Sequence, residues 1–272
     1  MIDQIYELPI QSLAVLTAIV FVGFYWLGCV FLRPVIRMIV SWKGADNEIV
    51  GNVLSAHNML YGLLLSLIAM AAYQNLIEVD AVVGDEASAL LALYRDASDF
   101  PPPQRERLCS LLRDYCQFTI DQEWPLQRKG VIPLGAHQRW LKPIGDIVFD
   151  FQPESKRDEL LQAAALKHFD ALEEHGRQRR HAAEAAIPTV MWYVVIVGTI
   201  ISSVLMWLFQ MRFVTQLFLG GLLAFFLGTL ILLIAVLERP YRSIQFGVSP
   251  EAHQLVYDTM IRDEILQSDR QE

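Results

Sequence analysis

Small and polar residues line one face of the second long apolar stretch of this 272-residue chain. Hydroxyl and amide groups in hydrocarbon are costly without partners, so this face should avoid lipid. It either packs against a neighbouring helix or lines a water-filled path, in which polar groups replace part of an ion's hydration shell. The residues recur at steps of three and four, which places them on one side of a helix: Ser55, Asn58, Gly62, Ser66, Ala69 and Tyr73.

Two sets of residues on this helix are candidates for lining a pore, depending on how the helix is rotated. An apolar ring, which would gate by dewetting, would consist of Leu63, Leu67 and Met70. A polar ring would consist of Ser55, Gly62 and Ser66. The sequence does not choose between the two sets.

Other ionisable residues suggest weaker roles. His57 is the only histidine of the apolar stretches, and its position near the start of the second stretch favours an interfacial location or a hydrogen bond to a neighbour over a gating role. His168 and His175 lie seven residues apart but lack a third ligand, so no metal site is predicted. Three arginines before the third apolar stretch either attract anions or lipid head groups, or only fix the topology: Arg177, Arg179 and Arg180.

Catalytic signatures are missing from the sequence. It contains no G-x-x-x-x-G-K-[ST] phosphate loop, no G-x-S-x-G elbow and no H-E-x-x-H zinc helix. Glu123 beside Trp124 fits a helix end better than a general acid. We therefore expect neither an enzyme nor a cofactor. The net charge of -8, without a basic cluster that outweighs it, also argues against a nucleic-acid partner.

Four charge-free stretches must position these residues. The chain is 54% hydrophobic with a mean hydropathy of +0.33, and the stretches are 25, 29, 27 and 25 residues long. A hydrocarbon core needs about 20 apolar residues of helix, so each stretch can cross a bilayer. The stretches are Leu8–Leu32, Ile49–Ile77, Ala185–Met211 and Phe213–Leu237.

The predicted fold is an all-α membrane protein with four transmembrane helices, two before and two after a helical cytoplasmic domain. The first membrane pair occupies residues 1–77, with spans at about 10–32 and 53–76. The helical domain occupies 78–184, a membrane hairpin 185–237 and a cytoplasmic tail 238–272. Gly198 with Ser202, and Gly220 with Ala224 and Gly228, are small residues spaced for tight helix packing.

The segment 78–184 has helical periodicity throughout. Val79, Val83, Leu90 and Tyr94 continue the second span as an amphipathic helix, and Pro101–Pro103 precede a further helix. That helix is predicted to end near Trp124–Pro125, because proline disfavours helix in the preceding residue. Two more stripes follow, so four amphipathic stripes predict a bundle with a buried seam.

Basic residues near the spans set the orientation. Five arginines flank the spans on the side of segment 78–184: Arg177, Arg179, Arg180, Arg239 and Arg242. Four basic residues lie on the other side: Arg33, Arg37, Lys43 and Arg212. The positive-inside rule therefore narrowly favours a cytoplasmic bundle.

Several short motifs together resemble the bestrophin-like family of bacterial membrane proteins. The resemblance runs from about Gly51 to Tyr257. Its motifs are Tyr61-Gly62-Leu63-Leu64, Asp85-Glu86-Ala87, Leu93-Tyr94-Arg95, Arg113-Asp114-Tyr115, Glu123-Trp124-Pro125, Ile187-Pro188 with Trp192, and Arg239-Pro240-Tyr241.

This resemblance implies a likeness to bestrophins, which are pentameric anion channels whose second membrane helix lines the pore. It implies a homo-oligomer in the bacterial inner membrane, with lipid and inorganic ions such as chloride as partners. The acidic calcium clasp of animal bestrophins has no match here, and their aromatic-rich neck is not evident in the aliphatic segment Leu63–Met70. Neither ion selectivity nor calcium gating therefore carries over. The expected function is an anion channel; the alternative is a non-conducting scaffold or signalling protein whose helical domain binds a partner.

Overall fold

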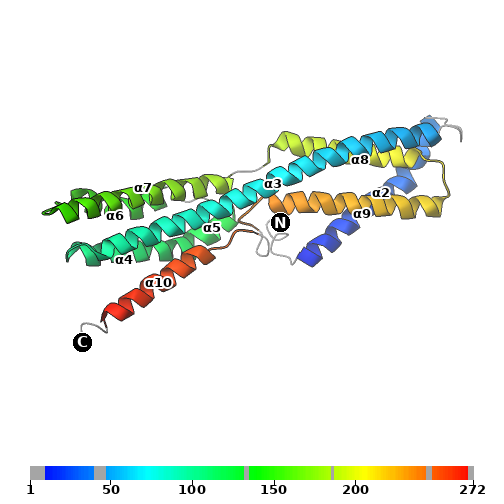
Figure 1. The fold of residues 1–272 in the computed structure, drawn as a ribbon. Helices are drawn as coiled ribbons and strands as arrows, with labels where there is room; N and C mark the ends of the chain where they lie inside the picture. Colours follow the sequence, from blue (N-terminus) through cyan, green and yellow to red (C-terminus); the bar gives the residue numbers. More distant parts are fainter. Residues whose placement is uncertain (1–9, 40–46, 132–134, 185–186, 243–246, 269–272) are drawn as a thin grey trace. The chain divides into compact units, whose positions relative to one another are not determined.

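The regular secondary structure of the residues that the structure describes is helical. The structure is a computed structural model, and it describes residues 10–39, 47–131, 135–184, 187–242 and 247–268. Lys43, which entered the orientation count, lies outside these ranges. Four of the described helices are long and apolar enough to cross a membrane: α2 (Ile10–Ile39), α3 (Asn47–Ser98), α8 (Thr189–Leu208) and α9 (Phe213–Leu237) (Figure 1). The prediction of a four-span, all-α protein is confirmed.

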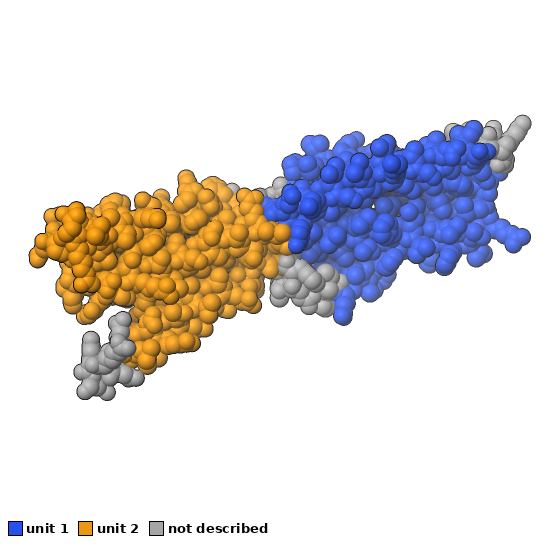
Figure 2. Space-filling view, viewed as in Figure 1, with its two compact units in different colours: residues 1–75, 186–239 blue, residues 76–185, 240–272 orange. Residues whose placement is uncertain are grey.

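The chain forms two compact units (Figure 2). Unit 1 comprises residues 1–75 and 186–239, and unit 2 comprises residues 76–185 and 240–272. The helix α3 contributes its first part to unit 1 and its second part to unit 2.

Unit 1 is held together by close helix packing at small residues. Gly220 of α9 lies against Tyr25 of α2, and a Cβ atom there would come 2.0 Å from Tyr25 Cζ. Gly198 of α8 lies against Tyr61 of α3, where a Cβ atom would come 2.3 Å from Tyr61 Cε2. Small residues let helix backbones approach closely. The predicted packing role of these glycines is confirmed.

The helix α3 continues through 52 residues without interruption. Its apolar part is followed by an amphipathic part in which Val79, Val83, Leu90 and Tyr94 are all buried. The prediction that the second span extends into the helical segment is therefore confirmed.

The helix that follows the three prolines does not end at Trp124, so that prediction was wrong. The chain runs from α4 (Gln104–Phe118) through a π-helical turn, η2 (Thr119–Glu123), into α5 (Trp124–Arg128). Pro125 lies at the start of α5, directly after the π turn, and it has no backbone N–H to donate to that turn. The π turn carries Glu123 into the interior, where it is 1% exposed.

The core of unit 2 joins five helices. Besides α3 and α4 these are α6 (Ala136–Asp150), α7 (Lys156–Glu184) and α10 (Glu251–Ser268). Their apolar stripes meet in one buried cluster that includes Leu93, Leu112, Ile144, Leu172 and Met260. The predicted helical bundle is confirmed, and α10 from the segment after the last span is part of it.

Candidate functional site

One face of α3 in unit 1 is left uncovered by the other residues that the structure describes. Leu63, Leu67 and Met70 are 60%, 63% and 55% exposed, and Ser55 and Ser66 are exposed as well. Among the described atoms, none lies within 4 Å of a Cβ atom built on Gly62. All six pore-lining candidates therefore lie on the side of α3 that unit 1 leaves uncovered.

The other side of α3 packs against α8 and α9. Tyr61, Leu65 and Ile68 are buried there, and the Tyr61 hydroxyl donates to Val195 O at 2.7 Å. His57 Nε2 lies 3.2 Å from Gly198 O and 3.0 Å from Ser202 Oγ. His57 thus hydrogen-bonds α8, as its position suggested, and the packed face fixes the rotation of α3 within unit 1.

The three arginines before α8 have different environments. Arg177 is exposed and pairs with Glu174 on its own helix. Arg180 is half-buried, and burial lowers its pKa. Arg179 is fully buried and pairs with Glu86 and Glu123, so it is not placed to meet an anion or a lipid head group at the surface.

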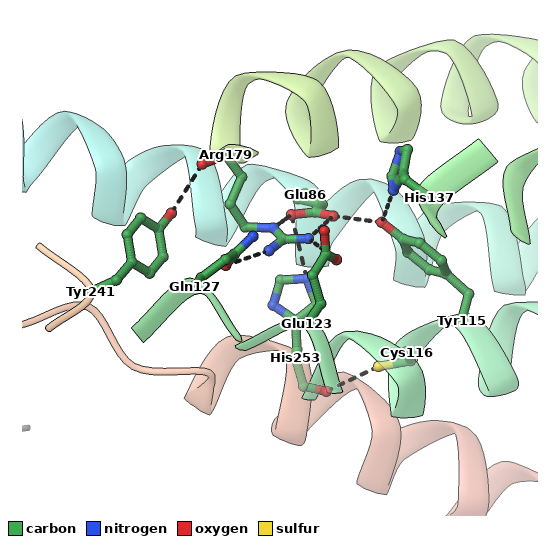
Figure 3. A network of polar contacts seen from close by, with 9 residues as sticks. All are labelled: Glu86, Tyr115, Cys116, Glu123, Gln127, His137, Arg179, Tyr241 and His253. Atoms are coloured by element: carbon green, nitrogen blue, oxygen red, sulfur yellow. Dashed lines mark hydrogen bonds and ion pairs between the residues drawn. The ribbon is translucent and has the colours of Figure 1, made fainter. Parts of the chain in front are cut away.

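Arg179 is the centre of a buried polar network in unit 2 (Figure 3). Its Nε donates to Glu86 Oε2, its Nη2 donates to Glu123 Oε2 at 2.7 Å, and its Nη1 donates to Gln127 Oε1 at 2.8 Å. Two carboxylates and one amide therefore surround a single guanidinium. These groups come from four elements: α3, η2, α5 and α7.

Further side chains extend this network. Tyr115 of α4 donates to Glu86 Oε1 at 2.6 Å and lies 3.4 Å from Nδ1 of His137. His253 of α10 places Nε2 3.6 Å from Glu86 Oε2. The Tyr241 hydroxyl donates to the main-chain oxygen of Arg179 at 3.3 Å. Glu86 is thus shared by side chains from three other helices.

The glycine at position 176 allows the helices to approach at this network. A Cβ atom there would lie 2.8 Å from His137 Cε1 and 3.1 Å from Glu86 Oε1. Contacts of that length are repulsive, so any larger residue would push α7 away from α3 and α6. Gly176 therefore brings Arg179, one turn further along α7, within reach of both carboxylates.

Mutual attraction keeps the network charged despite its burial. Burial favours neutral Glu86, but Arg179 and His253 outweigh it and hold the pKa of Glu86 well below its usual range. Burial also opposes the charge on Arg179, and Glu86 and Glu123 outweigh it and raise the pKa of that guanidinium. His137 differs, because burial and repulsion from Arg180 lower its pKa to about 3. At neutral pH, His137 is therefore uncharged.

Some buried atoms of this region have no hydrogen-bond partner among the described residues. They include Glu123 Oε1, Gln127 Nε2, His137 Nε2 and both ring nitrogens of His253. No group of three or more His, Cys, Asp or Glu within the described ranges is placed to hold a metal ion. His168, which the sequence analysis considered as a metal ligand, lies with Nδ1 2.6 Å from Asp96 Oδ2.

The motifs of the family resemblance meet in this network although they are far apart in the sequence. Glu86, Tyr115, Glu123 and Tyr241 each belong to a different motif. Gln127, His137 and His253 were not predicted from the sequence, and Arg179 was expected at the surface. A signal existed for the histidines: His137 precedes Leu141 and Ile144 at helical spacing, and His253 precedes Val256 and Met260 in the same way.

Four apolar spans and a helical bundle with a buried charge network define this chain as a helical membrane protein. The profile of the bestrophin-like domain matches residues 19–253. The chain belongs to the bestrophin-like family.

Solved structures of a bacterial bestrophin homologue from Klebsiella pneumoniae have a similar fold. One point mutant has a TM-score of 0.64 at 12% sequence identity, covering 92% of this chain and 98% of that chain. A second point mutant has a TM-score of 0.62 at 11% identity, covering 91% and 99%. A third structure of the homologue has a TM-score of 0.63 at 12% identity, covering 91% and 97%. A search of curated proteins found no match. At these identities the likeness establishes the fold.

Proposed function

We propose that this protein is an oligomeric ion channel that passes anions such as chloride along the uncovered face of α3. Bestrophins are ion channels, and family membership supports a function of this kind. The observation that carries the proposal is the face of α3 with Gly62, Ser66 and Leu67, which the described part of the chain leaves uncovered. In an assembly of identical subunits, this face would surround a central axis.

Leu63, Leu67 and Met70 supply the apolar part of this path, and Ser55, Gly62 and Ser66 supply the polar part. The Ser66 hydroxyl donates to Gly62 O at 2.8 Å within its own helix. The hydrogen of this hydroxyl is therefore paired within the helix, and side chains of this kind can line a path without leaving a donor unpaired. An apolar ring beside it would control hydration of the path.

The rest of the proposed arrangement follows the sequence analysis. The protein is a homo-oligomer, with a pentamer as the expected state, in a bacterial inner membrane. The segment 78–184 and the tail lie in the cytoplasm, and the domain boundaries are those set out from the charge pattern. Of the three arginines before α8, Arg177 and Arg180 are the ones proposed to meet anions or head groups.

Cysteine accessibility tests the proposed path. Cys29 and Cys116 are buried and Cys109 is partly exposed, so Cys109→Ala provides a suitable background. In liposomes with a chloride gradient, a water-soluble thiosulfonate should react with Ser66→Cys and Leu67→Cys and block flux. The cysteine thiolate, which forms in water and not in hydrocarbon, attacks the sulfenyl sulfur of the reagent, displaces sulfinate and leaves a mixed disulfide on the protein.

Phe218→Cys on α9 is the matched control, because Phe218 is 70% exposed in unit 1 and is expected to face lipid. It should remain unmodified, with normal flux. Equal modification at both places, or modification of Ser66→Cys without any change in flux, contradicts the proposed path. A well-folded oligomer that passes no ion under varied voltage, calcium and pH contradicts the channel and favours the scaffold.

A further inference from the structure

The polypeptide passes between the two units at three points. The first point lies within α3 at Asn75 and Leu76, the second between Ala185 and Ala186, and the third between Arg239 and Pro240. Any change in unit 2 can reach the membrane spans through these three covalent connections.

The unit 2 residues close to these points share one buried apolar cluster. Val79 and Val83 follow the first point in α3, and Tyr241 follows the third. Ala182 of α7 comes shortly before the second point and packs against the same cluster. Trp124 of α5 completes it, with its ring centre 5.5 Å from that of Tyr241. All three segments are therefore packed together inside unit 2.

The Arg179 network joins the same three segments by polar contacts. Arg179 of α7 pairs with Glu86 of α3, and its main-chain oxygen accepts the Tyr241 hydroxyl at 3.3 Å. The Arg179 guanidinium carbon also lies 5.8 Å from the centre of the Trp124 ring. A buried network of this kind resists small displacements, because each one leaves a charge or donor unpaired in the interior.

We propose that the Arg179 network and its apolar cluster act as a clamp that holds the three segments together within unit 2 and thereby sets ion flux. The part concerning flux rests on the proposed function. Displacing one segment breaks contacts of the other two, so the three segments are expected to move together. Tyr241 and Arg179 are positioning residues: they act through the segments that they hold and touch no ion.

Two tyrosines provide a matched test. Tyr241 and Tyr94 are both 3% exposed, and each donates its hydroxyl to a main-chain oxygen in unit 2. The acceptor of Tyr94 is Met260 O at 3.2 Å, in the bundle core away from the clamp. Tyr241→Phe and Tyr94→Phe therefore remove equivalent hydrogen bonds, and only the first belongs to the clamp.

The two variants are compared with the wild-type oligomer in chloride flux and in amide hydrogen exchange. Tyr241→Phe should speed exchange in residues 76–83 and 179–182 and change flux about two- to thirtyfold, the range that mutations in coupling networks produce. Tyr94→Phe should leave both unchanged while lowering the unfolding temperature to a similar extent. A merely structural role of Tyr241 would affect flux no more than the Tyr94 control does.

Results other than these separate the clamp from its role in ion flux. Unchanged exchange in both segments of Tyr241→Phe overturns the clamp. Faster exchange with the same flux as Tyr94→Phe overturns its role in conduction and leaves the channel intact. If the wild-type protein passes no ion, the proposed function and the flux part fail together, and hydrogen exchange alone decides whether the segments are clamped.

Discussion

Replacing Arg179 by methionine should destabilise unit 2 strongly. The change keeps much of the side-chain volume and removes the guanidinium that pairs with Glu86 and Glu123, which are 0% and 1% exposed. Both carboxylates would then remain buried without a cation as close as Arg179 is in the wild type. Removing one partner of a buried ion pair typically costs about 3–5 kcal/mol.

Thermal unfolding of the purified oligomer measures this loss. For a unit of this size, the expected cost corresponds to a decrease of roughly 6–20 °C in the unfolding midpoint. Arg177→Met is the matched control, because Arg177 lies two residues away on α7, is exposed and pairs with Glu174 on the surface. An exposed pair contributes little, so the control should unfold as the wild type does.

The pH dependence of the difference provides a second measurement. Without Arg179, burial raises the pKa of Glu86 above its usual range, whereas Arg179 and His253 lower it in the wild type. A buried carboxyl with a raised pKa takes up a proton more readily in the folded state than in the unfolded state. The stability difference between the variant and the wild type should therefore become smaller as the pH falls from 7 to 5. Adding Glu86→Gln to Arg179→Met should likewise recover part of the stability.

Three results would refute this reasoning. The first is an unfolding midpoint of Arg179→Met equal to that of Arg177→Met. The second is a loss of stability in Arg179→Met that does not depend on pH, and the third is no recovery of stability when Glu86→Gln is added. Any of them would mean that solvent reaches the carboxylates and that the network is not a buried ion pair.

Three further predictions concern packing and protonation. Gly176→Ala should lower the free energy of unfolding by about 1–3 kcal/mol through overpacking, as measured in denaturant titrations. In the same titrations Gly84→Ala should stabilise α3 by about 0.5–1 kcal/mol, because no described atom lies within 4 Å of the added Cβ. Because the pKa of His137 is lowered to about 3, wild-type stability should fall between pH 6.5 and pH 5 by at most about 1.4 kcal/mol per pH unit, and His137→Gln should flatten that slope. Gly220→Val should prevent assembly of unit 1, as detected by loss of the oligomer on size exclusion, whereas Gly62→Ala should assemble normally and alter only chloride flux.

The membrane architecture was predictable because its cause is local in sequence. A bilayer requires about 20 consecutive apolar residues of helix, and the charges at Arg33, Glu48 and Glu238 show where such stretches begin or end. The continuation of α3 was also predictable, since Val79 and Val83 extend a periodic pattern along one helix. The same holds for Gly220, whose spacing from Ala224 and Gly228 signals close packing.

The site in unit 2 was less predictable, because its contacts join distant parts of the chain. Arg179 reaches Glu86 across 93 positions and Glu123 across 56. Next to a membrane span, an arginine has the same sequence signature whether it faces solvent or the interior. The π turn at Thr119–Glu123 was likewise not visible in the apolar periodicity, which predicted a helix end at Trp124–Pro125 instead.

The four apolar spans and the helical bundle could be predicted from residues that are close in the sequence, because hydrocarbon and water impose their requirements on every short segment separately. The folded structure was needed to show that Arg179 turns inward and that α10 joins the bundle. It also decided which face of α3 stays uncovered by unit 1. Those outcomes depend on which helices meet, since a charge can be buried only where distant residues provide the opposite charge at hydrogen-bonding distance.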